Sequence, residues 1–233
     1  MKVAIFSDVH GNKEALKAII NDIKKNNIDE IICLGDVIGI GPNPKECMDI
    51  IIDNNIEMVL GNHELYFLKG TEIDDEIKEE ELNHHRWVKE QLNDRHRQYL
   101  EKCNLTLEKE YGNKKVLLGH FLIDNNSKDN YPFYGFNIIN DGSIKDIVKE
   151  LNYDLLFVGH EHKEFIVDNK LYDVGSSGCR KDNITRYTVL DTDSFEVETK
   201  NIEFNREQFE KDLLEREYPD RDPIANWFFG TNF

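Results

Sequence analysis

The stretch Val3-Ala4-Ile5-Phe6-Ser7-Asp8-Val9-His10 decides the fold of this 233-residue chain. Val3 to Phe6 is a short, uninterrupted apolar run, as expected of a strand that is buried on both faces of a sheet. Two possible metal ligands, Asp8 and His10, follow it directly. If the backbone stays extended there, residues two apart point to the same side, so both side chains are predicted to face one metal centre.

Four further apolar runs end in the same kind of residue. The runs at 31–34, 58–60, 116–118 and 155–158 lead into Gly35-Asp36, Gly61-Asn62-His63-Glu64, Gly119-His120 and Gly159-His160-Glu161-His162. In α/β folds, loops from separate strands converge at the carboxyl edge of the sheet. We therefore expect these residues to meet at one site, with His160 and His162 sharing a side as Asp8 and His10 do.

Helices are predicted between the runs. Apolar residues recur at helical spacing from Ala15 to Ile23, which gives a β-α-β unit and a parallel sheet centre. Pro44 is placed to open a second helix, and Ser143 with Asp146 resembles a capping box that opens another. Runs at 165–167, 171–174, 186–190 and 195–202 are typical of antiparallel hairpins and predict a second sheet packed on the first.

Two segments lie outside this pattern. The pattern of the charged region at about 70–110 predicts a helical insertion. It consists of two helices separated by a break near Asn93-Asp94. We favour a solvent-exposed insertion, with a partial lid as the alternative, and expect surface histidines there rather than ligands (His84, His85 and His96). Residues 205–233 predict an amphipathic helix and an aromatic tail that docks on the core or on a partner (Trp227, Phe228, Phe229 and Phe233).

Composition narrows the function classes. The net charge of −17, from 29 basic and 46 acidic residues, disfavours general nucleic-acid binding but leaves small phosphorylated substrates open. No apolar run is long enough for a membrane span and no signal segment precedes the first strand, so we expect a soluble, cytoplasmic protein. One domain over residues 1–233 is predicted, and the oligomeric state stays open.

The cysteines and the ligand types bear on the metal. Cys33, Cys47, Cys103 and Cys179 form no Cys-x-x-Cys pair, which favours reduced thiols over disulfides or a zinc-thiolate site. Two carboxylates, one carboxamide and several imidazoles suit Mn, Fe, Ni or Zn better than Ca. We expect two divalent transition-metal ions, with Mn favoured.

The five motifs, in this order, resemble those of the calcineurin-like metallophosphoesterases, in particular a small bacterial and archaeal phosphodiesterase-like branch. The resemblance implies a four-layer α/β/β/α sandwich, two mixed sheets flanked by helices, in agreement with the strand and helix pattern. It assigns one metal to Asp8, His10 and His162, the other to Asn62, His120 and His160, and the bridge between them to Asp36. His63 is then the catalytic histidine.

The implied reaction is phosphodiester hydrolysis by a metal-bound hydroxide at a dinuclear site, with His63 protonating the leaving alkoxide. Alternatives on the same site are a phosphomonoesterase or nucleotidase and a protein phosphatase. An alternative of another class is a noncatalytic scaffold with this fold. The presence of His63 favours catalysis over that scaffold. The residues that bind the rest of the substrate are left open.

Several positions carry two interpretations. Glu64 either supports His63 or is an ordinary exposed carboxylate, and Arg180 either contacts a substrate phosphate or forms a surface salt bridge. Gly39-x-Gly41 is explained by turns rather than by phosphate binding. Phe121 stands where the resembling branch has Gly and is expected to narrow the pocket. Glu161 is expected to point away from the metals if the strand alternation continues.

Overall fold

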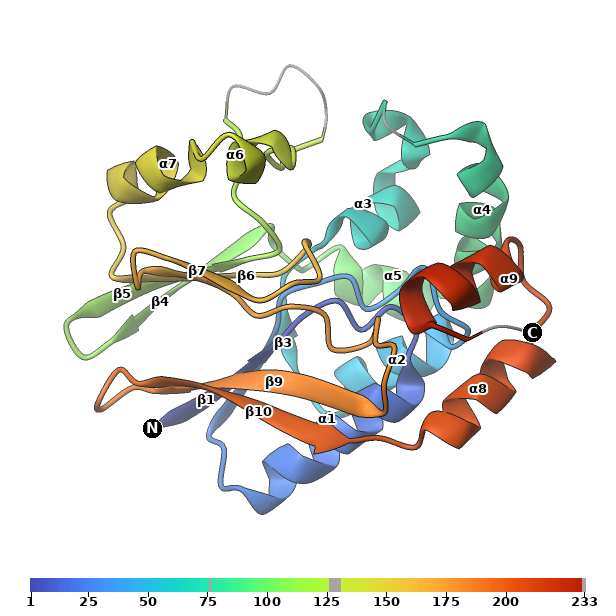
Figure 1. The fold of residues 1–233 in the computed structure, drawn as a ribbon, viewed down its shortest axis with the longest axis horizontal. Helices are drawn as coiled ribbons and strands as arrows, with labels where there is room; N and C mark the ends of the chain where they lie inside the picture. Colours follow the sequence, from blue (N-terminus) through green and yellow to red (C-terminus); the bar gives the residue numbers. More distant parts are fainter. Residues whose placement is uncertain (76, 126–130, 232–233) are drawn as a thin grey trace.

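Two packed sheets form the centre of the molecule in the computed structural model, which describes residues 1–75, 77–125 and 131–231 (Figure 1). Within these residues each sheet has five strands, in the orders β10-β9-β1-β2-β3 and β4-β5-β6-β8-β7. The first sheet comprises β1 (Lys2–Phe6), β2 (Glu30–Cys33), β3 (Glu57–Met58), β9 (Ile184–Asp191) and β10 (Val197–Glu203). The second comprises β4 (Thr106–Tyr111), β5 (Lys114–Gly119), β6 (Leu155–Val158), β7 (Phe165–Val167) and β8 (Leu171–Asp173).

Both sheets are mixed, which confirms the predicted fold class. Strands β1, β2 and β3 run parallel, as do β5, β6 and β8. The hairpins β9–β10, β4–β5 and β7–β8 are antiparallel. The sequence pattern missed β4, because the charged residues of TLEKEY interrupt its apolar side.

The strands that lead into the site are buried on both faces. Val3 and Ile5 of β1 belong to the apolar cluster between the two sheets. Ala4 and Phe6, which point the other way, belong to the cluster under the helices. This alternation explains why the strand reads as a continuous apolar run, and it holds the strand's carboxyl end in a fixed position.

Helices cover the outer faces of the sandwich (Figure 1). On the first sheet lies α1 (Lys13–Lys25), which contacts β9, β10 and the neighbouring α2 (Pro44–Asp53). On the second lie α6 (Asn137–Asn140) and α7 (Ile144–Glu150). Helix α3 (Asn62–Lys69) precedes the insertion, which contains 3-10 turns at Thr71–Ile73 and Glu79–Glu81, α4 (Leu82–Gln91) and α5 (Asp94–Leu100). The C-terminal region contains α8 (Arg206–Glu215), α9 (Arg221–Ile224) and a π turn, Ala225–Phe229.

Some local predictions are confirmed and others are wrong. Asn93 caps α5, since its side-chain oxygen accepts from the backbone N–H of Arg95 at 3.0 Å, so the predicted helix break is correct. The capping box at Ser143 does not form. Its hydroxyl instead donates to Asp141 at 2.7 Å, because a short Asp at the third helical position cannot replace Glu or Gln.

The predicted surface position of the histidines in the insertion is wrong. His84 is 5% exposed and packs against Trp87 and Tyr218. His96 is fully buried with its Nε2 3.0 Å from the Asp49 carboxylate of α2. The charged residues occupy the opposite face of these helices. The number of charged residues therefore did not indicate the apolar and aromatic face that packs on the rest of the chain.

The aromatic tail docks on the chain's own core. Phe229 is fully buried and meets the ring of Phe209 edge to face at 4.8 Å, whereas Trp227 stays 69% exposed. Phe233 lies outside the described residues. Among the described helices, none has the length and apolar content needed to cross a bilayer. The single domain and the cytoplasmic location remain predictions.

Candidate metal centre

The seven predicted ligand residues lie together at the carboxyl edge of the two sheets. Asp8 and His10 follow β1, and Asp36 follows β2. Asn62 opens α3, and His120 follows β5 directly. His160 and His162 follow β6. Each of these residues lies in a loop at the end of a buried strand or at the start of a helix. The order of the strands in the two sheets therefore brings the seven side chains together.

One group of donor atoms is formed by Asp8, His10 and His162. The two Nε2 atoms of His10 and His162 are 2.9 Å apart. Asp8 Oδ1 lies 3.6 Å from the first and 3.4 Å from the second. Its other oxygen accepts the backbone N–H of His160 at 3.0 Å, which orients the carboxylate.

A second group is formed by Asn62, His120 and His160. Asn62 Oδ1 lies 3.0 Å from His120 Nε2 and 3.1 Å from His160 Nδ1. The two imidazole nitrogens are 3.1 Å apart. The three atoms therefore form a nearly equilateral triangle.

Asp36 stands between the two groups. Its Oδ2 lies 3.7 Å from His10 Nε2 and 3.3 Å from His120 Nε2. Its Oδ1 accepts the backbone N–H of His63 at 3.0 Å. One oxygen of Asp36 is thus a shared corner of both groups.

This arrangement fits divalent cations. His120 Nδ1 lies 2.9 Å from Leu34 O and His10 Nδ1 lies 3.3 Å from Ile38 O, and since a carbonyl only accepts, both Nδ1 atoms donate and both Nε2 lone pairs face the centre. Ligand atoms held at about 2.1 Å by one ion lie about 3.0 to 3.4 Å apart, close to the separations above. Asp8 Oδ1 is buried without a hydrogen bond. The assignment of individual ligands remains a prediction.

The electrostatics agree with such a site. Burial alone would raise the pKa of Asp8, but the neighbouring imidazoles of His10 and His162 hold it well below its usual value. Burial lowers the pKa of His160 to about 3, with help from His120. Burial would also lower the pKa of His120, but the Asp36 carboxylate raises it to about 9. Ionised carboxylates and inward-facing imidazoles together attract cations, and an ion binding at His120 would replace its proton.

The backbone of the ligand loops differs from the extended form that the residue spacing predicts. Asp8 and His10 have φ values of 54° and 44°, and His160 and His162 have 78° and 59°. These left-handed conformations turn the chain sharply past the strand end. Asp8 and His10 still contribute to one donor group, but His160 and His162 contribute to different groups, so the expectation that this second pair shares a side is wrong. The loops rather than strand alternation orient all four side chains.

Glu64 has neither of the roles considered for it. It is fully buried, and Oε2 accepts the N–H groups of Asp36 at 2.8 Å and Gly61 at 3.0 Å. Its Oε1 accepts those of Val37 at 2.9 Å and Ile38 at 3.2 Å. Glu64 therefore fixes the loop that carries Asp36 to the start of α3.

His63 lies where two cavities meet. Its partly buried ring is 5.0 Å from that of His10, 5.7 Å from that of Tyr66 and 5.5 Å from that of His85. A cavity of 560 Å³ on one side and one of 370 Å³ on the other both include His63 in their walls. Burial lowers the pKa of His63 well below its usual value.

The insertion contributes to the larger cavity. Its walls include His85 and Glu81 from the insertion, and aromatic rings from both sides. The segment therefore borders the site, as the partial-lid alternative requires, and is not only a solvent-exposed insertion. Sequence reasoning missed His85, because nothing in its spacing separates it from its neighbours.

Gly39 has a role beyond a turn. Its φ is +84°, and a Cβ there would lie 2.1 Å from His63 Nδ1. The loop must therefore lack a side chain for the His63 ring to occupy its place. No phosphate-binding role is needed to explain this glycine.

Three further expectations have clear outcomes. Phe121 is 1% exposed and packs 5.3 Å from the His160 ring, so it supports that ring and lines neither of the two cavities. Glu161 borders the smaller cavity with Oε1 buried, because the strand alternation expected to turn it away is absent. Arg180 pairs with Asp182 at 3.1 Å, in agreement with the surface salt bridge.

The two packed mixed sheets, with Asp, Asn and His donors gathered at their carboxyl edge, define a metallophosphoesterase. The chain belongs to the calcineurin-like phosphoesterase family, whose model matches residues 1–164. It is therefore a metal-binding hydrolase that acts on phosphoester bonds.

One similar sequence and one similar structure extend over most of the chain, and a second sequence matches a shorter part of it. An uncharacterized protein of Methanocaldococcus jannaschii is 30% identical over 240 residues, which cover 94% of each chain. A symmetrical bis(5'-nucleosyl)-tetraphosphatase of Haemophilus ducreyi is 37% identical over 71 residues, 29% of this chain and 26% of that protein. A metallophosphoesterase structure from Sphaerobacter thermophilus has a TM-score of 0.70 at 23% identity, covering 97% of this chain and 98% of the other. At 23% identity, that structure supports the fold alone.

Proposed function

We propose that this protein is a phosphodiesterase that works with two divalent transition-metal ions, Mn being favoured over Fe, Ni or Zn. One ion would be held by Asp8, His10 and His162, the other by Asn62, His120 and His160, and Asp36 would bridge them. The observation that carries the proposal is the position of Asp36 Oδ2, 3.7 Å from His10 Nε2 and 3.3 Å from His120 Nε2. A dinuclear centre needs a bridging ligand, and one carboxylate oxygen between two imidazole-rich groups has the geometry for that role.

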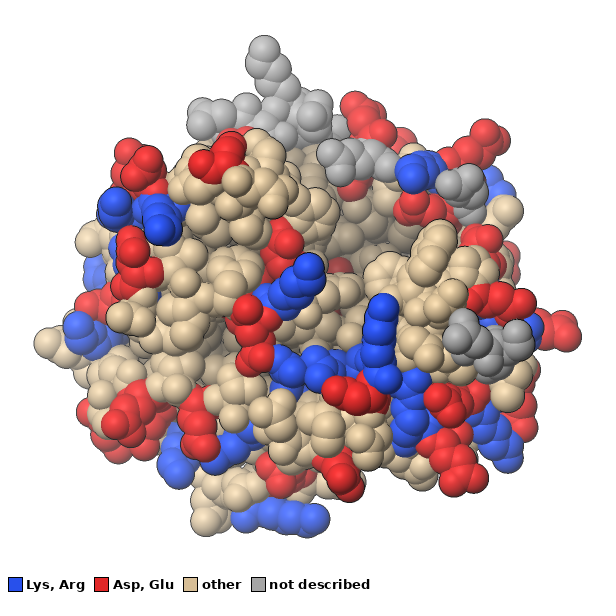
Figure 2. All heavy atoms as spheres, viewed as in Figure 1, with Lys and Arg blue, Asp and Glu red and all other residues tan. Residues whose placement is uncertain are grey.

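The cavity walls support the need for metal. Neither Lys nor Arg occurs among the described residues that line the two cavities. The face in Figure 2 shows basic and acidic side chains interspersed, with no wide basic field that would attract a polyanion. A phosphate group in the site would therefore need cations other than Lys and Arg side chains. Bound divalent ions would supply that charge and lower the pKa of a water molecule there.

The position of His63 supports a role as the acid that protonates the leaving group. The ring lies in both cavity walls, 5.0 Å from the His10 ring, without being needed for either ligand group. A substrate with its phosphate beside Asp36 would extend its leaving group past His63. The imidazole would then donate a proton to the departing oxygen.

The larger cavity favours diesters over monoesters. Its walls carry the carboxylates of Asp74, Asp75, Glu81 and Asp124, which repel additional negative charge. They also carry aromatic rings that suit the second organic group of a diester (Tyr66, Tyr131, Phe133 and Phe136). A monoester dianion has more charge and one organic group fewer, so it fits this wall less well.

A nucleotidase is the second candidate on the same site. Tyr66 and Tyr131 lie nearly parallel at 18°, with ring centroids 6.5 Å apart, in the wall of the larger cavity. A nucleobase can stack on such rings. The nucleosyl-tetraphosphatase similarity covers only 71 residues and supports this alternative weakly. The noncatalytic scaffold is disfavoured, since His63 and the cavities beside the donor atoms would be superfluous there.

The test compares substrates and metals on one preparation. We expect the metal-depleted protein to regain hydrolysis of bis(p-nitrophenyl) phosphate with Mn²⁺ or Ni²⁺, and to hydrolyse p-nitrophenyl phosphate more slowly. Excess chelator should abolish both activities. Full activity in the chelated protein would overturn the metal mechanism, and faster monoester hydrolysis would overturn the diesterase assignment.

A further inference from the structure

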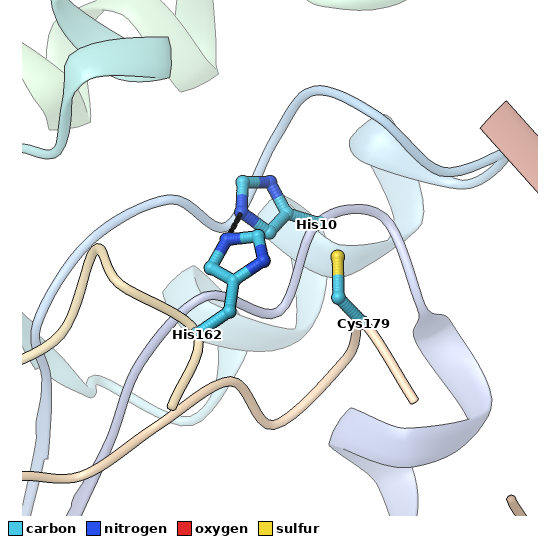
Figure 3. A group of neighbouring side chains, drawn as sticks. All are labelled: His10, His162 and Cys179. Atoms are coloured by element: carbon cyan, nitrogen blue, oxygen red, sulfur yellow. Dashed lines mark hydrogen bonds between the residues drawn. The ribbon is translucent and has the colours of Figure 1, made fainter. Parts of the chain in front are cut away.

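A cysteine that no motif marks lies beside one of the two ligand groups. His10, His162 and Cys179 each offer a donor atom, and the three atoms lie within 4.8 Å of one another. Figure 3 shows the Cys179 sulfur beside the His162 ring, with the two imidazoles joined by their 2.9 Å contact. The three residues come from separate segments, so the cluster is a product of the fold.

The backbone around Cys179 is tied to the loop that carries Asp8. The Ser176 hydroxyl accepts the N–H of Cys179 at 2.8 Å and donates to Asp8 O at 2.8 Å. Gly178 N donates to the same carbonyl at 3.0 Å. A Cβ on Gly178 would lie 1.7 Å from Val9 O, so the two loops are in direct contact. These contacts fix the position of the thiol relative to the histidines.

A second observation points to an ion at this place. Asp8 is fully buried, and its Oδ1, 3.4 Å from His162 Nε2, has no hydrogen-bond partner among the described residues. A buried carboxylate oxygen without a donor needs a cation. That oxygen and the Cys179 sulfur both lie beside the imidazole of His162.

We propose that Cys179 is a thiolate ligand of the metal held by Asp8, His10 and His162, and that it makes this position selective for thiophilic ions. The inference rests on the proposed metal-binding role of those residues and adds a ligand to it. The site would then be chemically asymmetric, and the preference for Mn²⁺ would apply to one of the two positions only. The position at Asn62, His120 and His160 offers only nitrogen and oxygen and suits Mn²⁺, whereas a sulfur ligand favours Zn²⁺, Co²⁺ or Fe²⁺.

Cobalt reports a sulfur ligand directly. When the metal-depleted protein is loaded with two equivalents of Co²⁺, we expect a near-ultraviolet thiolate-to-cobalt charge-transfer band. Cys179→Ser should lose the band and keep the weak visible bands of cobalt bound to nitrogen and oxygen. The matched control is Cys103→Ser, which removes another half-buried thiol and should keep the band. We also expect Zn²⁺ to bind Cys179→Ser at least about tenfold more weakly, with a smaller change for Mn²⁺.

A measurement on the unaltered protein keeps the proposal testable if a variant does not fold. Alkylation by iodoacetamide, mapped by peptide mass spectrometry, should slow at Cys179 when Zn²⁺ is bound and stay unchanged at Cys103. Cobalt bound without the charge-transfer band, or equal alkylation of Cys179 with and without bound Zn²⁺, would overturn the thiolate ligand and leave the dinuclear site intact. Failure to bind any metal would instead overturn the proposed function.

Discussion

The Glu64 carboxylate accepts the backbone N–H of Asp36 at 2.8 Å, so a residue of α3 holds the loop whose side chain stands between the two ligand groups. Three further N–H groups, from Val37, Ile38 and Gly61, complete the set around the two oxygens. Because all four donors are backbone groups, Glu64 fixes the course of the chain and leaves the Asp36 side chain available.

Glu64→Gln should destabilise the fold and weaken metal binding together. The amide NH₂ would face two N–H donors in place of an acceptor oxygen, and unpaired buried polar groups cost about 1 to 3 kcal/mol each. We expect a lower free energy of unfolding in urea and a weaker affinity for Mn²⁺ by calorimetry. Glu207→Gln, at an exposed position of α8, is the control and should change neither quantity. Wild-type stability in Glu64→Gln would refute the anchoring role.

Gly39→Ala tests the contact with His63. The Cβ would lie 2.1 Å from His63 Nδ1 and force the ring to move. Gly112→Ala is a matched control, because Gly112 also has a positive φ, +63°, but nothing lies within 4 Å of its Cβ. Both variants should lose about 1 kcal/mol of stability from backbone strain, and only Gly39→Ala should lose most of its kcat. Equal kcat values for the two variants would show that the position of His63 does not matter.

His63→Asn should separate metal binding from catalysis. If His63 protonates the leaving group, its loss should lower kcat by about 10² to 10⁴. The seven ligand residues are untouched, so we expect Mn²⁺ affinity by calorimetry to match the wild type. An activated leaving group such as p-nitrophenolate needs less protonation, so the loss should be greater with an alkyl leaving group. An undiminished kcat with an alkyl diester would exclude His63 as the acid.

Buried His84 should make stability depend on pH. Burial lowers its pKa from 6.5 to about 4, so the unfolded chain binds a proton at a pH where the folded chain does not. Protons therefore favour unfolding across this window, and stability falls as the pH drops from about 6.5 to 4, by about 1.4 kcal/mol per pH unit. In His84→Phe, which keeps an aromatic ring between Trp87 and Tyr218, the slope of unfolding free energy against pH should be smaller by that amount. Parallel slopes for the two proteins would contradict this account.

The parts of the fold that the sequence predicts are those with uninterrupted apolar runs. The run at Val3 to Phe6 matches β1 and that at Leu155 to Val158 matches β6, because both faces of these strands are buried. Strand β4 escaped prediction, since its charged residues break the apolar pattern. Long-range packing decides its place, and a single sequence does not show this.

The residues of the candidate site also include some that the sequence predicts and others that it does not. Residues at strand ends, such as Asp36 and His120, were predicted together because topology alone brings those ends to one edge. The burial of Glu64 and the position of Cys179 depend on which loops touch, and neither residue type nor spacing indicates that. His85 likewise reached the cavity wall only through the packing of the insertion.

Five of the seven predicted ligand residues have left-handed φ values: Asp8, His10, Asp36, His160 and His162. Such a conformation costs a residue with a side chain about 1 to 3 kcal/mol, and glycine would relieve it. A related protein with the same fold but no hydrolytic activity would be more stable with glycine at these five positions. This chain keeps the side chains and therefore the backbone strain. His162→Gly should therefore raise the melting temperature of the metal-depleted protein. Selection for thermal stability and selection for activity thus act in opposite directions on the same five codons.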